Sequence, residues 1–195
     1  MHRAMTSRLH TPVCDLLGCD VPIMLAGMGG VARSELVAAV TRAGGFGFLG
    51  MVRESPRLIA EEIAKVRSVT ERDFGVNLIP AATPPDLFAA ELDCCIAEQV
   101  PVVALFWDLS QAAVARLREA SILVVCQVGS VEEAVAAANA GAQIIIAQGA
   151  EAGGHVRGMR ARNELLPEVV AAVPVPVLAA GGIADGQAVA EALGL

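Results

Sequence analysis

Residues 122–149, ILVVCQVGSVEEAVAAANAGAQIIIAQG, contain one complete alternation of strand and helix. An apolar run opens the stretch and another closes it, as expected for strands that are buried on both faces of a parallel sheet. Between them, Ser130 precedes an alanine-rich segment with two early glutamates, and Gly141 follows it. Serine before the first turn and glycine after the last are typical of helix ends. The stretch therefore predicts a β-α-β unit.

The same alternation extends over most of the chain. Continuous apolar runs predict strands at residues 21–26, 46–49, 75–79, 102–106, 122–126, 143–147 and 175–179. Longer amphipathic segments predict helices at residues 34–43, 56–69, 85–98, 111–119, 131–140, 165–172 and 186–193. This order predicts an α/β fold, either a (β/α) barrel or a doubly wound sheet, and periodicity does not choose between them. No linker interrupts the pattern, so we expect a single domain over residues 1–195, with 1–20 as an amino-terminal lead-in.

Composition limits the size of the fold and the class of partner. The 195 residues fall short of the ~250 that are typical of an eight-unit barrel. Hydrophobic residues make up 55% and charged residues 18%, which excludes a disordered chain. The net charge of -7 argues against nucleic acid and anionic membranes as partners. No apolar run reaches the ~18 residues of a membrane span, and the first residues lack the apolar region of a secretory signal, so we expect a cytoplasmic protein.

The five cysteines are odd in number and include no CxxC pair. Free cysteine is among the most buried residue types, so these positions predict reduced, buried thiols.

Functional residues of parallel β/α folds lie where the strands end. The first predicted strand runs into residues 24–30, MLAGMGG, whose glycines either let the backbone approach a flat ligand or form a tight turn. The third strand carries Asn77, an amide that can pair with a heterocycle edge or cap a turn. The sixth strand ends in residues 147–155, AQGAEAGGH, which bring an amide, a carboxylate, two glycines and a histidine to the mouth of the fold.

His155 is the strongest candidate for a catalytic group. The chain has three histidines, and the other two lie in the lead-in, which we expect to be mobile. Imidazole is suited to act as a general base near neutral pH, and flanking glycines leave the ring accessible; an exposed loop histidine is the simpler alternative. Because no further histidine accompanies it, a histidine metal site is not expected.

The seventh predicted strand ends in another glycine-rich turn. Residues 178–186 read LAAGGIADG and precede a predicted helix. Backbone N–H groups at Gly181 and Gly182 can bind a phosphate there, although an ordinary turn is the alternative. The chain has no P-loop motif, and no GxGxxG follows the first strand in a form that suggests a dinucleotide fold.

Four of these segments together resemble the nitronate monooxygenase family, formerly called 2-nitropropane dioxygenases. They are PIMLAGM at 22–28, FGVNL at 74–78, QGAEAGGH at 148–155 and AAGGIADG at 179–186. The third segment is highly specific. The resemblance spans residues 21–195 and implies a TIM-type (β/α) barrel that binds FMN and oxidises alkyl nitronates or nitroalkanes with molecular oxygen.

The resemblance also implies a role for each candidate residue. His155 matches the active-site histidine, which can take a proton from the carbon beside a nitro group. The implied FMN-binding positions are Met24, Ala26, Gly27, Asn77, Gln127, Gln148, Gly153, Gly154, Gly181 and Gly182. Of these, Gln127 is placed near the cofactor only by topology.

The chain departs from the family pattern in two respects. Family members continue into an eighth strand, whose Gly-Thr turn completes the phosphate site, whereas seven β/α units are visible here and the eighth is missing. We therefore expect this chain alone to bind FMN weakly, to show little activity and to self-associate through open barrel edges. The loop at 156–162 is also unusually basic; it either attracts an anionic nitronate or, as we favour, is solvated.

Two other functions stay open. An FMN-dependent enoyl reductase of acyl carrier protein thioesters shares the GGH loop and the GGI turn, but it consumes NAD(P)H. A non-catalytic flavin-binding protein is the second alternative, and the missing eighth unit supports it.

Overall fold

The computed structural model describes residues 9–194, in which one seven-stranded sheet has the order β1-β2-β3-β4-β5-β6-β7. Every neighbouring pair of strands is parallel. The strands are β1 (Met24–Leu25), β2 (Phe46–Gly50), β3 (Gly75–Leu78), β4 (Val102–Phe106), β5 (Leu123–Val128), β6 (Ile144–Gln148) and β7 (Val177–Ala180). A spatial order equal to the chain order is that of a (β/α) barrel, because a doubly wound sheet reverses direction at a switch point.

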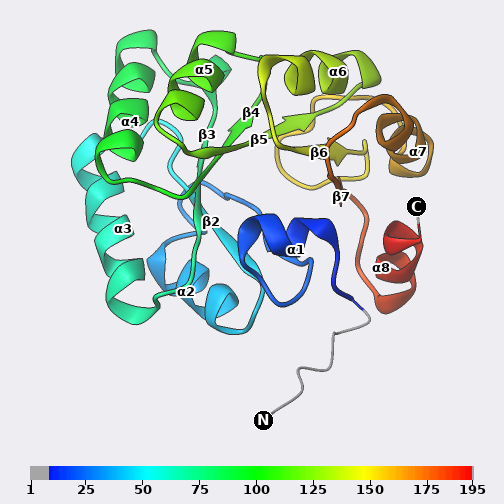
Figure 1. The fold of residues 1–195 in the computed structure, drawn as a ribbon, viewed down its shortest axis with the longest axis horizontal. Helices are drawn as coiled ribbons and strands as arrows, with labels where there is room; N and C mark the ends of the chain where they lie inside the picture. The colour runs from blue at the N-terminus through cyan, green and yellow to red at the C-terminus, as the bar shows by residue number, and fades with distance from the viewer. Residues whose placement is uncertain (1–8, 195) are drawn as a thin grey trace.

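Helices follow the strands as predicted. They are α2 (Ser34–Arg42), α3 (Pro56–Val69), α4 (Pro85–Ala97), α5 (Gln111–Glu119), α6 (Val131–Ala140), α7 (Arg162–Ala172) and α8 (Gly186–Leu193), with a short 3-10 helix η1 (Pro80–Ala82). Figure 1 shows α3 to α7 along the outer side of the curled sheet. The side chain of Ser130 accepts a hydrogen bond from the first turn of α6, so the predicted cap forms, and the side chain of Ser55 caps α3 in the same way.

The strands are buried on both faces because their residues alternate between two cores. Val103 and Leu105 of β4 belong to the core between the sheet and the outer helices. Val102 and Ala104 belong to a second core inside the curl, with Phe46 and Ile144. This period of two explains why the strands read as continuous apolar runs.

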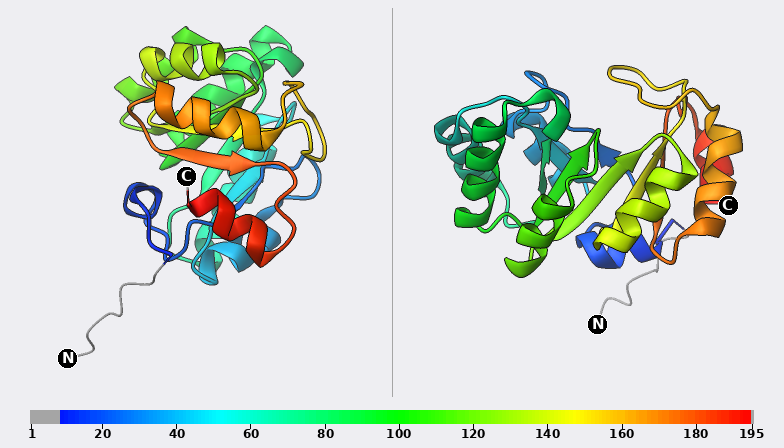
Figure 2. Two further views of the ribbon diagram at one scale, coloured as in Figure 1. Left: turned by 90° about the vertical axis from the view of Figure 1, so that its right-hand side faces the viewer. Right: turned by 90° about the horizontal axis from the view of Figure 1, so that it is seen from above.

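The two outermost strands leave the curl open. β1 pairs with β2, β7 pairs with β6, and no strand within residues 9–194 joins β1 to β7. Both edge strands are half-buried, whereas β2, β3 and β4 are buried throughout. The two views in Figure 2 show the same curled, open arrangement. The fold is thus a TIM-type barrel with seven β/α units visible and without the eighth.

The amino-terminal lead-in contains a helix that the sequence prediction missed, α1 (Pro12–Leu17). Its Val13, Cys14 and Leu17 are buried in the inner core with Phe46 and Ile144, the first residues of β2 and β6. Helix α1 therefore covers the amino ends of the strands, and the expectation of a mobile segment is wrong for this part. Residues 1–8 of the predicted lead-in, with one of the histidines, lie outside the described residues.

Two predicted boundaries need correction. Strand β1 is only Met24–Leu25 instead of 21–26, since Pro22 has no N–H for a ladder and the strand lies at the edge. Helix α7 begins at Arg162 instead of 165, because groups outside the helix bind its first turn, as described below. Other boundaries agree within two residues.

All five cysteines are free, and Cys94 is the one that is only half-buried. None of the helices formed by residues 9–194 combines the length and the apolar character needed to cross a membrane.

Candidate cofactor and active site

A cavity of about 380 Å³ opens where the strands end. This volume falls in the range of ~300–1,000 Å³ that is typical of ligand pockets. Nine of the ten predicted FMN-binding residues line it, namely Met24, Ala26, Gly27, Asn77, Gln127, Gln148, Gly153, Gly181 and Gly182. The tenth, Gly154, and the predicted base His155 are not among its lining residues. The fold thus brings together residues that are up to 158 positions apart, from Met24 to Gly182.

The three amides of the cavity have different hydrogen-bond partners. Asn77 Nδ2 donates to the Ala104 carbonyl at 3.3 Å, and its Oδ1 has no partner within residues 9–194. Gln148 is paired at both amide atoms: Nε2 donates to the His155 carbonyl at 2.9 Å, and Oε1 accepts from the Arg157 N–H at 3.4 Å. Gln127 is half-buried, and its amide makes no hydrogen bond within the described part of the chain. Asn77 and Gln127 can therefore pair with a heterocycle, whereas Gln148 holds the loop after β6.

Gly27 has a structural reason to lack a side chain. A Cβ built on it would lie 2.2 Å from the Cβ of Asn77, which is an overlap. The glycine lets the loop after β1 pack directly on β3, so the sequence interpretation of close approach to a ligand is not the sole explanation of this residue.

The turn after β7 has two consecutive glycines with a left-handed backbone. Gly181 and Gly182 have φ values of 104° and 65°, in the left-handed region that disfavours other residues. Neither of their N–H groups donates to another group within residues 9–194. Helix α8 follows, and the Asp185 carboxylate caps it by accepting from the Ala188 N–H at 2.8 Å. The two glycine N–H groups are thus available to an anion.

Arg162 is a site residue that the sequence analysis missed. It was included in a loop expected to be solvated, yet it is buried, and its Nη1 donates to the Gly181 carbonyl at 3.1 Å. The Glu151 carboxylate accepts from the Arg162 N–H at 3.0 Å and so caps α7, and this hydrogen bond lowers the pKa of Glu151. Arg162 therefore connects the loop after β6 to the glycine turn after β7.

The other arginines of this loop pair with acidic neighbours. Arg157 forms ion pairs with Glu133 at 2.6 Å and Asp108 at 3.0 Å, and Arg160 pairs with Glu168 at 2.6 Å. They are half exposed or exposed, in agreement with a solvated loop. Their charge is largely neutralised, so the structure offers no support for attraction of a nitronate by this loop.

His155 is exposed and packs against an aromatic ring that the sequence analysis did not select. The Trp107 and His155 ring centroids lie 4.9 Å apart in an edge arrangement, with 72° between the planes. Trp107 and Asp108 have φ values of 54° and 53°, an uncommon backbone for residues other than glycine. Two consecutive left-handed residues mark a backbone that is held in place by its surroundings, which is common at functional sites.

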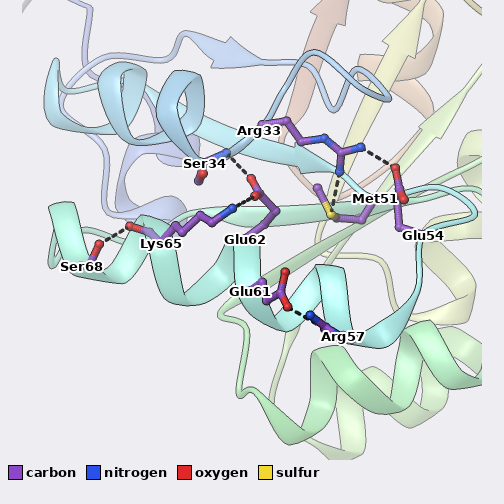
Figure 3. A network of polar contacts seen from close by, with 9 residues as sticks. All are labelled: Arg33, Ser34, Met51, Glu54, Arg57, Glu61, Glu62, Lys65 and Ser68. Carbon is purple, nitrogen blue, oxygen red and sulfur yellow. Dashed lines mark hydrogen bonds and ion pairs between the residues drawn. The ribbon is translucent and has the colours of Figure 1, made fainter.

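A polar network fixes the loops beside the cavity (Figure 3). Arg33, which follows the β1 loop, donates to Met51 Sδ at 3.5 Å and pairs with Glu54 after β2. The buried Glu62 carboxylate accepts from the Ser34 N–H at 2.8 Å, and thereby caps α2. The loops after β1 and β2 are therefore fastened to each other and to α3.

Glu91 of α4 forms a hydrogen bond with the loop after β2. Its side chain is fully buried; Oε1 accepts from the Glu54 N–H at 3.0 Å, and Oε2 has no partner in the described structure. Burial raises the pKa of Glu91 to about 7. Glu91 was not selected by the sequence analysis, because its burial depends on the packing of α4.

Among residues 9–194, no group of His, Cys, Asp or Glu side chains is arranged to hold a metal ion.

Comparison with known proteins identifies the family. Residues 10–195 match the family model of nitronate monooxygenase. A relative from Mycobacterium tuberculosis, named (3aS,4S,5R,7aS)-5-hydroxy-7a-methyl-1-oxo-octahydro-1H-indene-4-carboxyl-CoA dehydrogenase, is 40% identical over 190 residues, which cover 95% of this chain and 52% of the relative. The chain thus spans about half the length of the curated relatives it matches.

Two solved structures have similar folds. FabK from Thermotoga maritima has a TM-score of 0.90 at 36% identity, over 95% of this chain and 58% of that one. A nitroalkane oxidase from Streptomyces ansochromogenes has a TM-score of 0.85 at 33% identity, over 94% of this chain and 64% of that one. The strand order, the cavity and the family match agree, and the chain belongs to the nitronate monooxygenase family, a family of flavin-dependent oxidoreductases.

Proposed function

We propose that the protein binds FMN in the 380 Å³ cavity and oxidises alkyl nitronates or nitroalkanes with molecular oxygen. The observation that carries this proposal is the convergence of nine predicted FMN-binding residues on one cavity. The substrate and oxygen are the partners that the proposal requires, and a cytoplasmic location stays a prediction.

The residues present fit a flavin mononucleotide. Within residues 9–194, the N–H groups of Gly181 and Gly182 have no acceptor, and they suit the phosphate. Asn77 Oδ1 and the Gln127 amide have no partner in the same part of the chain and lie on a mostly apolar wall, as a heterocycle requires. Met24 and Gly153 line the remaining cavity next to them. When bound, FMN supplies the chemistry that carries electrons from the substrate to oxygen.

His155 acts as the proposed base toward neutral nitroalkanes. Its backbone is held by Gln148 and its ring by Trp107, so the imidazole has a defined position two residues from the cavity-lining Gly153. The imidazole takes the proton from the carbon beside the nitro group, while a preformed nitronate has already lost this proton.

A thioester substrate is the second candidate. The Mycobacterium tuberculosis relative at 40% identity is named as a dehydrogenase of a carboxyl-CoA compound, which is a thioester like the substrate of an enoyl reductase. This candidate uses the same cavity and the same histidine, and it differs in the electron donor and acceptor.

The experiment that separates these candidates measures oxygen uptake and NAD(P)H oxidation by the chain extended through an eighth β/α unit and loaded with FMN, because the 195 residues alone are expected to show little activity. We expect oxygen uptake with propyl-2-nitronate in the absence of NAD(P)H. Consumption of NAD(P)H with an enoyl thioester, without nitronate-dependent oxygen uptake, would reject the proposal in favour of the reductase. A stable flavin spectrum without either activity would favour a non-catalytic flavin-binding protein.

A further inference from the structure

A second cavity, of about 280 Å³, lies beside the first. Its floor is apolar and consists of Leu105, Cys126 and Val128 from β4 and β5 with Ala137 from α6, and the exposed Ala136 of α6 lies at its mouth. Leu105, Cys126 and Val128 belong to the core between the sheet and the helices, so this cavity lies outside the curl of the sheet. Gln127 lines both cavities and forms a shared wall.

The rim of the second cavity carries three charged side chains that form ion pairs with one another. Arg157 Nε pairs with Glu133 at 2.6 Å, and its Nη2 pairs with Asp108 at 3.0 Å. The other Glu133 oxygen accepts from the Gly129 N–H at 2.8 Å. Two carboxylates against one guanidinium leave the rim slightly negative, which does not favour an anionic ligand. With charges paired at the rim and aliphatic groups below, the interior suits an uncharged apolar group.

The second cavity is also connected to His155. Trp107 lines the cavity, and its ring packs on the His155 ring at 4.9 Å. Arg157, two residues after His155, closes the rim. The loop is further held by Gly158, which packs so closely on Gly129 that a Cβ on either residue would overlap the other backbone. His155 therefore contacts Trp107, which lines the second cavity, and is two residues from Gly153, which lines the first.

We propose that the second cavity binds an unbranched alkyl chain; on the function proposed above, this is the chain of the nitronate or nitroalkane. At ~30 Å³ for each water-sized group and the packing density of protein interiors, about 280 Å³ holds a chain of roughly six to eight carbons. The nitro end of the ligand then lies on the side of His155, and its alkyl chain lies in the cavity that Trp107 lines. That the bound alkyl chain belongs to a nitronate or nitroalkane rests on the proposed function. The existence of an apolar binding site does not depend on it.

The first test needs no turnover. Trp107 is the single tryptophan of the chain, so its fluorescence reports on the cavity that it lines. We expect 1-hexanol and 1-octanol to change this emission saturably in the FMN-loaded protein. Ala136→Leu fills the mouth of the cavity and should weaken octanol binding by about tenfold, at roughly threefold to fourfold for each methylene displaced. Ala115→Leu on the exposed face of α5 is the matched control and should bind as the unmodified protein does.

The second test uses kinetics with nitronates of three to eight carbons. We expect KM to fall by up to about threefold per added methylene, and Ala136→Leu to remove this gain. Emission that does not respond to alkanols, or that responds equally in the Ala136→Leu and Ala115→Leu proteins, overturns the proposal. Saturable alkanol binding without turnover of any nitronate supports the alkyl site and rejects the proposed reaction. Nitronate turnover with a KM that does not depend on chain length in the unmodified, Ala136→Leu and Ala115→Leu proteins rejects the alkyl site and agrees with the proposed reaction.

Discussion

At the scale of single residues, His155 is the group whose proposed role is chemical. Replacement by alanine removes the base without a cavity in the core, because the side chain is exposed. We expect His155→Ala to reduce turnover of a nitroalkane by a factor of ~10²–10⁴, and turnover of the matching nitronate far less, since the nitronate has no proton to lose. His10→Ala, at an exposed histidine paired with Asp15, is the control. Equal losses with both substrates would assign His155 to binding instead.

Glu91 is a residue whose role is structural and depends on pH. Its folded-state pKa of about 7 lies above the ordinary value of 4.5, so the neutral form is favoured in the folded protein. The stability that protonation contributes is complete below pH 4.5, falls as pH rises and is lost above about 7. This loss is at most about 3 kcal/mol.

Glu91→Gln keeps an acceptor for the Glu54 N–H without a titrating proton. We expect its free energy of unfolding to exceed that of the unmodified protein at pH 8 and to differ little at pH 5, measured by urea denaturation. Glu119→Gln, at an exposed position of α5, should follow the unmodified protein at both pH values. The same pH dependence in the Glu91→Gln and unmodified proteins would show that Glu91 does not titrate in this range.

At the scale of elements, Arg162 joins the start of α7 to the turn after β7. Loss of its buried hydrogen bond to the Gly181 carbonyl should let this turn move. We expect Arg162→Gln to weaken FMN binding by about tenfold or more, because a charge-assisted hydrogen bond contributes ~1.5–3 kcal/mol. Flavin fluorescence titration measures this change. Arg160→Gln removes an exposed pair with Glu168 and should leave FMN affinity unchanged; an equal effect of both variants would contradict the role of Arg162.

The sequence predicted those elements whose signal is local. The strands after β1 and most helices follow from apolar runs and from caps such as Ser130, which do not depend on distant residues. Helix α1 was missed because it has only 6 residues, although Pro12 at its first turn and Gly18 at its end are helix signals. Arg162 and Trp107 were missed because their importance arises from contacts with Gly181 and His155, which the chain meets only after folding.

The resemblance selected the residues that line the cavity better than the residue patterns did. Taken alone, Asn77 and the Gly27 segment fitted turns as well as ligand contacts, and Gly27 indeed packs on Asn77. Their common cavity could not be inferred from spacing, because the curl of the sheet brings them together. The exposure of His155 agrees with the alternative of an exposed loop histidine, whereas its position outside the lining of this cavity could not be predicted from its motif.

At the scale of the whole molecule, the open sheet is the feature with the clearest physical consequence. The half-buried strands β1 and β7 lack a partner on one side within residues 9–194. Unpaired strand edges promote association, so we expect the 195-residue chain, produced alone, to form oligomers at micromolar concentration in sedimentation experiments. Ile23→Lys places a charge beside β1 at a side chain that is 53% exposed, and should reduce this association. A monomer at all concentrations would contradict the prediction.

A crystal structure of the protein with FMN would show whether the cavity where the strands end is a flavin site. We expect the phosphate on the N–H groups of Gly181 and Gly182, with the ring beside Met24, Gly27 and Gly153. Flavin at the opposite rim, near helix α1, or bound outside this cavity would contradict it.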